Sequence, residues 1–173
     1  MEKLRVSSDT LEDAKIRTYE YGPSEYYEAK RLLRKNEEVP DNLLKAIAAE
    51  PNEAEHYALL LLVYKKPIPP IILESVASSS STAFMVAGYM ARRTNQKIPD
   101  ELIQAIAKNP YDSEGFAEDL LYYRKEMPPQ IILESIASNR DIASELKYHL
   151  KKLGMPIPPI IQQALDRPEQ KQE

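Results

Sequence analysis

The sequence predicts an all-α protein in which helix pairs stack into a right-handed α-solenoid. Three observations predict this fold class: a motif that returns at a fixed period, apolar residues at helical spacing inside each copy, and a composition of 14 prolines against 4 glycines. A β-rich chain of 173 residues would use more glycine in its turns. We therefore expect a single domain, residues 1–173, of about ten or eleven helices.

The repeated motif opens with proline and continues as an apolar helix. Five segments carry it: "VPDNLLKAIA" from Val39, "IPPIILESVA" from Ile68, "IPDELIQAIA" from Ile98, "MPPQIILESIA" from Met127 and "IPPIIQQAL" from Ile157. Spacings of 29, 30, 30 and 29 residues separate their matching apolar positions, Ile47, Val76, Ile106, Ile136 and Leu165. A period of about 20–50 residues is typical of stacked repeat proteins.

Each copy is expected to form two helices. The proline lies in the first turn of the first helix, where a missing N–H has no helical partner to lose. A polar break such as "KNPYDS" or "SNRD" then supplies turn and N-cap residues, and a second helix begins behind it. Two helices of this size cannot bury their apolar faces alone, so stacking of the copies should provide the core.

Alternate copies match better than adjacent ones. "LLVYKK" and "LLYYRK" match at an offset of 59 residues, and "IILESVAS" and "IILESIAS" at 60, which indicates a four-helix block as the unit of duplication. We expect N-terminal capping helices over residues 1–38, tandem repeats over 39–166 and a polar tail over 167–173. Asp9 and Glu12 have the spacing of a capping box and would open the first capping helix.

These motifs resemble the short HEAT-like helix-pair repeats. In that class a proline or apolar residue opens the first helix, an "LL-x-A-[IV/L]" core follows, and "A-x-x-L" marks the second helix. The resemblance covers Pro40 to Leu165, although the aspartate and arginine ladder of HEAT repeats does not recur here. It implies a stacked architecture and a bias towards binding, and it names no partner.

The sequence carries little sign of catalysis or of a cofactor. Without cysteine there is no disulfide, no thiol nucleophile and no cysteine zinc site, and the four glycines are too far apart for a phosphate-binding loop. Glu53 and His56 have the spacing of a di-iron bundle ligand pair, but Asp112 and Gly115 occupy the positions 59 residues later. We expect no metal, no cofactor and no enzymatic activity.

Acidic residues also gather where one second helix begins. Carboxylates there could bind Mg²⁺ or act in acid–base chemistry, but other copies carry acids in similar places, which the helix dipole explains. The set consists of Asp112, Glu114, Glu118 and Asp119. His149 lies four residues after Glu145 and is interpreted as an ordinary helix histidine. An enzyme built from scattered carboxylates and tyrosines would require a pocket that holds several perturbed groups.

Every second helix ends in a dibasic pair: Arg34 and Lys35, Lys65 and Lys66, Arg92 and Arg93, Arg124 and Lys125, Lys151 and Lys152. Four tyrosines accompany them: Tyr64, Tyr89, Tyr123 and Tyr148. One interpretation is a basic stripe with interleaved aromatics that follows a phosphate backbone and stacks bases. The other is that cations at helix C-termini offset the helix dipole while tyrosine rings are buried. The acids at helix starts favour the second interpretation.

The leading hypothesis for function is a non-enzymatic protein or peptide interaction module, a scaffold or adaptor that uses the solenoid surface. Nucleic-acid binding through the basic stripe is the alternative, which the net charge of −4 disfavours for the surface as a whole. Leu59 and Leu60 stand where Glu118 and Asp119 stand one block later, which suggests an exposed apolar contact patch. The N-terminal helices could instead cover these leucines.

The remaining expectations concern location and assembly. The first residues, "MEKLRVSSDTLEDAK", lack the apolar run of a signal peptide, and no apolar segment approaches the ~18 residues of a membrane span. We expect a cytoplasmic protein without a membrane partner, as a monomer or with weak end-to-end self-association. The polar tail argues against stacking at the C-terminal end.

Overall fold

The computed structural model describes residues 24–167, and within that range it contains ten α-helices and one π-helix. In chain order these are α2 (Ser24–Arg34), α3 (Asp41–Ala48), α4 (Pro51–Val63), α5 (Pro70–Val76), α6 (Ser80–Arg93), α7 (Asp100–Ile106), α8 (Pro110–Asp119), η1 (Leu120–Arg124), α9 (Gln130–Ala137), α10 (Arg140–Lys152) and α11 (Pro159–Asp166). No strand occurs in this range, which confirms the all-α prediction. The predicted capping box at Asp9 and Glu12 lies outside the described residues.

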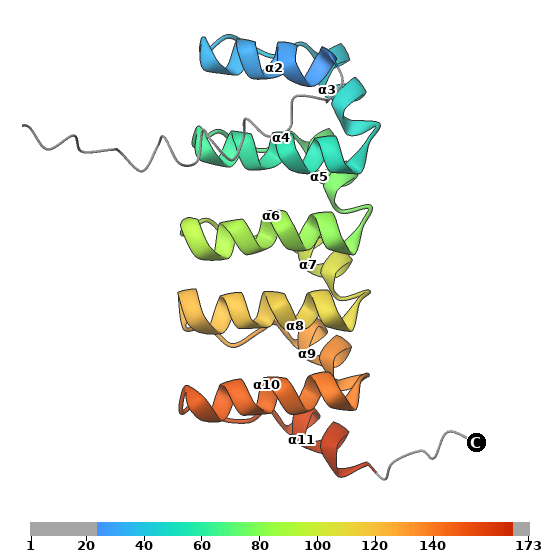
Figure 1. Cartoon of the computed structure of the whole chain (residues 1–173), viewed down its shortest axis with the longest axis vertical. Coiled ribbons are helices and arrows are strands. Elements are labelled where there is room, and N and C mark those ends of the chain that lie inside the picture. The colour runs from blue at the N-terminus through green and yellow to red at the C-terminus, as the bar shows by residue number, and fades with distance from the viewer. Residues whose placement is uncertain (1–23, 168–173) are drawn as a thin grey trace, which may run out of the picture.

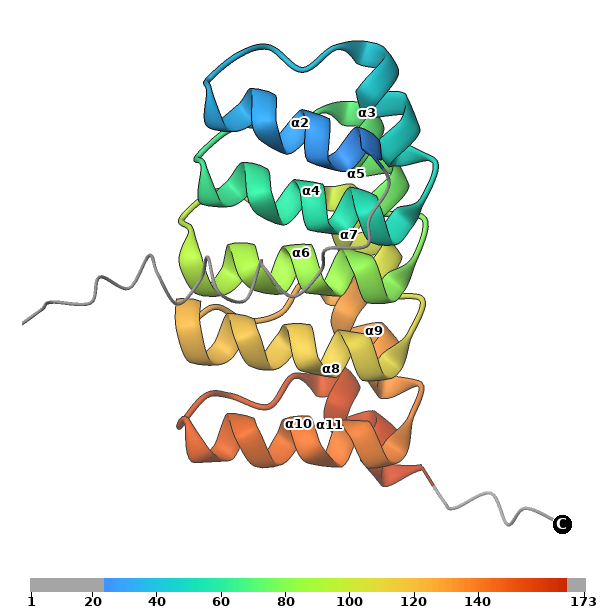
Figure 2. The same ribbon diagram turned by 45° about the horizontal axis from the view of Figure 1, so that its top comes forward.

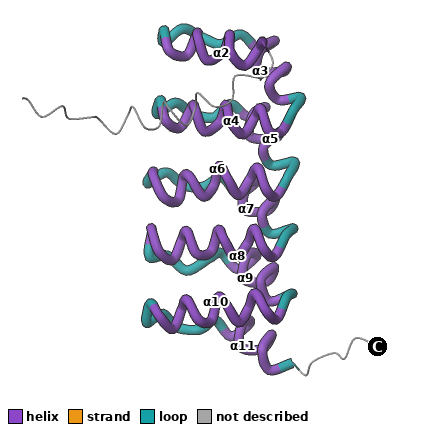
Figure 3. Tube along the Cα trace, viewed as in Figure 1, coloured by secondary structure: helices purple, strands orange, loops and turns teal. Residues whose placement is uncertain are grey.

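The helices form two rows. The long helices α2, α4, α6, α8 and α10 lie side by side in one row, and the short helices α3, α5, α7, α9 and α11 form a second row behind it (Figure 1; Figure 2). Loops join the rows at both edges of the stack (Figure 3). Each helix packs against its neighbours in the chain and in its own row. Each helix therefore buries its apolar face against helices of neighbouring copies as well as against its own partner helix.

The period of the sequence reappears in the structure. The five short helices begin at residues 41, 70, 100, 130 and 159, at intervals of 29, 30, 30 and 29 residues. The repeated proline is the N-cap of each short helix, with φ between −61° and −55°. This aligned proline thus lies just before the first turn and not inside it as expected, whereas Pro70 and Pro159, the first residues of α5 and α11, lie inside the first turn as expected. The fixed φ of proline suits this extended position, and the Pro69 carbonyl oxygen accepts from the Ile72 and Leu73 amides at 3.0 Å.

One apolar core runs along the stack between the two rows. The positions that set the sequence period lie in it: Ile47, Val76, Ile106 and Ile136 are buried, and Leu165, in the last short helix, is half-buried. In the second half of the chain, the polar breaks supply side-chain N-caps for the long helices, as expected. The side chain of Asn109 accepts from the Tyr111 amide, and that of Asn139 from the Asp141 and Ile142 amides.

The long helices share a way of ending. In the described chain, four of the five end at a residue with φ between 55° and 67°: Asn36, Lys65, Lys125 and Gly154. The next amide then reaches back to close the last turn, as Lys66 N does to the Leu61 carbonyl oxygen at 2.8 Å. Helix α6 differs, because Thr94 after its last turn is extended, with φ −133°.

The π-helix η1 accommodates one extra residue. Fifteen residues separate the N-cap from the left-handed residue in α4 (Glu50 to Lys65) and in α10 (Asn139 to Gly154), whereas sixteen separate them in α8 with η1 (Asn109 to Lys125). This explains why the sequence offset changes from 59 to 60 residues at this place. A wider turn absorbs the additional residue without displacing the loop that follows.

Lys65→Gly is expected to raise the free energy of unfolding by about 0.5–1 kcal/mol, because glycine adopts a left-handed conformation without a Cβ clash. Gly154→Lys should lower it by about 1 kcal/mol through φ alone, since nothing lies within 4 Å of the added Cβ. Urea unfolding followed by circular dichroism measures both. Lys151→Gly, within the last turn of α10, is the control and should destabilise by about 0.5–1 kcal/mol. If Lys65→Gly lowered the free energy of unfolding as much as Lys151→Gly does, the expected advantage of glycine at the left-handed position would be contradicted.

Candidate functional site

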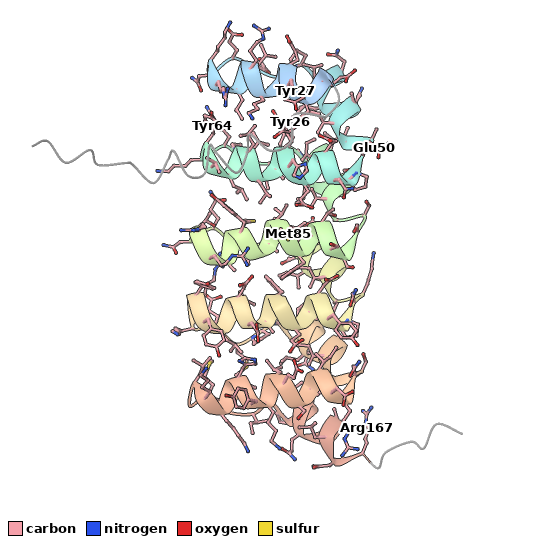
Figure 4. All side chains as sticks on the ribbon, in the orientation of Figure 1. Tyr26, Tyr27, Glu50, Tyr64, Met85 and Arg167 are labelled. Atoms are coloured by element: carbon pink, nitrogen blue, oxygen red, sulfur yellow. The ribbon has the colours of Figure 1, made fainter. Side chains whose placement is uncertain are left out.

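The dibasic pairs meet along one edge of the stack. All five long helices run in the same direction, so their C-terminal ends lie together at the left edge in Figure 1 and their N-terminal ends at the opposite edge. Figure 4 marks the two edges on α4, with Tyr64 at the first and Glu50 at the second. We call the ten cations at the first edge the basic edge: Arg34, Lys35, Lys65, Lys66, Arg92, Arg93, Arg124, Lys125, Lys151 and Lys152.

Three residues of the basic edge hold neighbouring repeats together. Arg124 Nη2 donates to the carbonyl oxygens of Met90, Thr94 and Gln96 at 3.0, 3.1 and 2.9 Å. The guanidinium thus satisfies carbonyls at the end of α6, the long helix that lacks a left-handed closing residue. Arg92 Nη1 donates to Asp119 Oδ2 at 2.5 Å. Lys66 Nζ donates to Asn36 Oδ1 at 2.6 Å.

The other seven cations of the basic edge are exposed. None of them forms an ion pair with a carboxylate of residues 24–167. They are Arg34, Lys35, Lys65, Arg93, Lys125, Lys151 and Lys152. A row of solvated cations at the ends of five parallel helices is available for contact with an anion.

The tyrosines align with this edge only in part. Tyr64 and Tyr123 lie at the ends of α4 and η1 and are 39% and 61% exposed. Tyr148 is exposed but lies within α10, one turn before the dibasic pair, and Tyr89 is half-buried against the core. Tyr89 and Tyr148 lie at equal sequence distances from their basic pairs, yet their surroundings differ, because Tyr89 packs against the core and Tyr148 is exposed.

The predicted apolar patch at Leu59 and Leu60 is wrong for Leu60, which is only 4% exposed, while Leu59 is half-buried against the core. Helix α4 packs against α2, α3, α5 and α6, and Leu60 belongs to the apolar core. The matching Asp119 is also buried. An acid is tolerated there because Arg92 binds it and not because the position faces solvent. Burial raises the pKa of Asp119, and the Arg92 guanidinium opposes that shift.

Two glycines allow α6 and α8 to approach each other. A Cβ added to Gly88 of α6 would lie 2.7 Å from Asp119 Oδ2, and one added to Gly115 of α8 would lie 2.9 Å from the Phe84 ring. Each helix thus offers a glycine to a large side chain of the other. Sequence analysis did not predict this close packing, and the signal that could have indicated it is a glycine in the middle of a helical pattern.

A second cluster lies between α8 and α10, where sequence analysis expected only helix-start acids and an ordinary histidine. We call its members the α8–α10 seam: Glu114 and Glu118 of α8, Tyr122 of η1, and Glu145 and His149 of α10. His149 Nε2 is 2.6 Å from Glu118 Oε1, and the Tyr122 hydroxyl is 2.8 Å from His149 Nδ1. Spacing along the chain could not reveal the seam, since its halves are about 30 residues apart.

The two remaining carboxyl groups of the seam are coupled. Burial, a hydrogen bond with Glu145 and the charges of Glu145 and Glu118 raise the pKa of Glu114 to about 7. Among residues 24–167 there is no group of three or more histidine and carboxylate side chains arranged to hold a metal ion.

A cavity of about 490 Å³ lies on the other side of α8, between α7 and α9. Its wall is mostly apolar and consists of Lys97, Ile98, Asp100, Ile103, Gln104, Phe116, Leu120, Arg124, Glu126, Met127, Pro129 and Ile131. No member of the α8–α10 seam lines it. This cavity and the Glu114 carboxyl with its raised pKa are therefore separate features, and they do not combine into the pocket that an enzyme hypothesis requires.

Comparison with protein-family models, with curated proteins and with solved structures gives no match. Among the described residues, no single helix has the length and hydropathy of a membrane span, and one bent pair, α5 with α6 at 119°, passes that test only when its two helices are combined.

Arg124→Gln is expected to lower the free energy of unfolding by about 1.5–3 kcal/mol, because the end of α6 loses charge-assisted hydrogen bonds. Arg93→Gln removes the same charge from a side chain without these contacts and should change stability by less than about 0.5 kcal/mol. Urea unfolding of the two variants provides the comparison. Equal effects would mean that the contacts of Arg124 contribute nothing to the fold.

Gly88→Ala is expected to destabilise by about 1–2 kcal/mol, since the new methyl group displaces the Asp119 carboxylate from Arg92. In an Asp119→Ala background the same substitution should stabilise by up to about 1 kcal/mol, because alanine is the better helix former once the clash is gone. A double-mutant cycle in urea measures the difference. An unchanged effect in both backgrounds would show that Gly88 does not serve this ion pair.

Proposed function

We propose that this chain is a right-handed α-solenoid of HEAT-like helix pairs, built from four-helix blocks, that acts as a non-enzymatic protein-interaction module. Its contact surface is the basic edge, and its partner is an extended acidic polypeptide segment. The observation that carries the proposal is the set of seven exposed cations, without an ion pair to any carboxylate of residues 24–167, along one edge of a chain whose net charge is −4. The periodic helix starts and the two packed rows support the architecture.

The spacing of the cations favours an anion that runs along the stack. Adjacent packed helices lie about 8–10 Å apart, which is within about one Debye length at physiological salt, so the fields of neighbouring pairs add. Three acids in the same loops, Glu37, Glu38 and Glu126, leave the cations in excess. A peptide in the polyproline II conformation has three residues per turn and rises about 3.1 Å per residue, so acidic side chains at every third residue lie on one face at about the helix spacing.

Single-stranded nucleic acid is the second candidate for this edge. Tyr64 and Tyr123 favour it, because exposed rings beside cations can stack on bases. Only these two tyrosines lie at the ends of long helices, in alternate repeats, and Tyr89 is half-buried. A peptide needs no regular aromatic platform, so the acidic segment is the better fit.

The test measures fluorescence anisotropy with two labelled probes, a 15-residue peptide with glutamate at every third position and a 15-nucleotide thymidine oligomer, at 50 to 200 mM salt. The edge variant Arg93→Gln/Lys125→Gln/Lys151→Gln spares the three residues that bond neighbouring repeats. The control Lys45→Gln/Lys108→Gln/Arg167→Gln removes the same charge from exposed positions at the short helices. The edge variant should weaken peptide binding about tenfold, at up to about 1 kcal/mol for each exposed contact.

The control variant should bind the peptide within about twofold of the parent, because only screened long-range charge has changed. Tighter binding of the oligonucleotide, with a log–log salt slope near −0.7 for each neutralised phosphate, would replace the acidic peptide with nucleic acid. No binding of either probe at 50 mM salt would overturn the proposal for the basic edge.

A further inference from the structure

We propose that the cavity between α7 and α9 receives one aromatic side chain of the acidic segment and thereby fixes where along the stack that segment binds. This inference rests on the proposed function, because it gives the same partner a second, apolar contact. The basic edge alone sets no register, since its cation pairs recur with every repeat and a segment displaced by one repeat meets similar charges. An apolar site at one position of the edge favours one register over the others.

The cavity has an apolar interior and a mostly polar rim. Ile98, Phe116 and Leu120 are 5%, 0% and 4% exposed and form the interior wall. The exposed side chains at the rim are Lys97, Asp100, Gln104, Glu126 and Ile131. A volume of about 490 Å³ is ample for one ring, since an apolar cavity of about 150 Å³ holds benzene.

The cavity lies where the repeats are irregular. Helices α7 and α9 pack less closely against each other than α3 and α5 do. The π-helix η1 contributes Leu120 and Arg124 to the wall, and π-helical turns are frequent at functional sites. Arg124 is fixed by three carbonyl oxygens of the preceding repeat. This part of the wall is therefore held in place before a partner binds.

One end of the cavity belongs to the basic edge. Arg124 is a member of both, and the exposed Lys125 follows it directly. The rim itself does not select an anion, because Lys97 is paired with Asp100, with 3.4 Å between Nζ and Oδ1, and Glu126 adds a second carboxylate. The carboxylates of the segment should therefore stay on the exposed cations of the edge, and an uncharged group should enter the cavity.

An extended acidic segment has the geometry to make both contacts at once. In the polyproline II conformation, glutamates at every third residue share one face, and the residues between them point to the sides. The cavity lies on the short-helix side of the edge, behind the row of long helices (Figure 2). The side chain that enters it should therefore be a direct neighbour of a glutamate in the sequence of the segment.

The wall favours an aromatic side chain. Phe116 and Met127 both line the cavity, and a ring gains from edge-on contact with another ring and from contact with a thioether sulfur. Pro129 and Ile131 add apolar surface at the opening. Aromatic side chains seated in such pockets are typical of the residues that dominate the affinity of protein interfaces.

The test compares three labelled 15-residue peptides by fluorescence anisotropy at 50 mM salt. The plain peptide has glutamate at every third position and alanine on both sides of the central glutamate. Two anchored peptides carry phenylalanine in place of one of these alanines, before or after that glutamate. At least one anchored peptide should bind about tenfold more tightly than the plain one, as burial of a phenylalanine side chain gives. Equal affinities would overturn the inference and leave the proposed function standing.

Two substitutions in the cavity should reduce that gain. Ile103→Trp fills the cavity from α7 and should abolish it, and Ile131→Ser, at a side chain 41% exposed, should reduce it at least about threefold. Leu73→Trp and Ile71→Ser, at the matching positions of α5, are the controls and should keep the gain. A gain that persists in both cavity variants would overturn the inference, because the ring would then bind elsewhere.

The edge variant described above separates the two proposals, because it should weaken the plain and the anchored peptides by the same factor. Failure of the plain peptide to bind would overturn the proposed function, whereas a gain sensitive to Ile103→Trp would still support the aromatic site. An anchored peptide with glutamine in place of every glutamate should bind at least about tenfold more weakly. Equal binding of that peptide would overturn the acidic partner in favour of an uncharged ligand. Dimers of the parent chain in analytical ultracentrifugation that Ile131→Ser disperses would assign the cavity to a second copy and also overturn the inference.

Discussion

The direction of the long helices is the constraint on which the other features depend. Because all five point the same way, their electropositive N-termini lie at one edge and their electronegative C-termini at the other. Side-by-side parallel dipoles repel, so each edge requires charges of the opposite sign. The dibasic pairs supply the cations, and acids in the first turn of α2, α4, α8 and α10 supply the anions, whereas α6 has no acid in its first turn. The row of cations is thus first a consequence of the architecture. These cations outnumber the acidic side chains that pair with them in the described part of the chain, and the unpaired ones are those that an anion could contact.

The same constraint explains how the repeats are joined. Each long helix must stop sharply so that the chain can return behind the stack to a proline-capped short helix, and a left-handed residue provides that stop in four of the five. Helix α6 lacks such a residue, and Arg124 from the next repeat bonds its terminal carbonyl oxygens instead. The extra residue in η1 lies just before Lys125, in the turn that carries Arg124. An irregular turn in one repeat thus accompanies an irregular helix end in the preceding one.

The all-helical, periodic arrangement was predictable from the sequence because each copy of the motif carries the same local signals. The apolar positions from Ile47 to Ile136 and the caps of Asn109 and Asn139 are local signals that the structure confirms. The motif prolines do mark where the short helices begin, although the aligned proline of each copy is the N-cap and not part of the first turn. The contacts between repeats were not predictable in this way. Leu60 and Asp119 occupy matching positions, and their different polarity suggested that the position is exposed. Both side chains are buried instead, because Leu60 packs in the apolar core and Asp119 pairs with Arg92. The seam residues Glu118 and His149 lie 31 positions apart, and only the relative rotation of α8 and α10 brings them together.

Seams between long helices therefore differ although the helices themselves repeat. Between α6 and α8 the buried acid is neutralised by Arg92, and two glycines bring the helices close. Between α8 and α10 the corresponding space holds three carboxyl groups and an imidazole, with no permanent cation. Because α10 also carries Lys151 and Lys152, the seam that positions this helix fixes where the last pair of the basic edge lies relative to the other four.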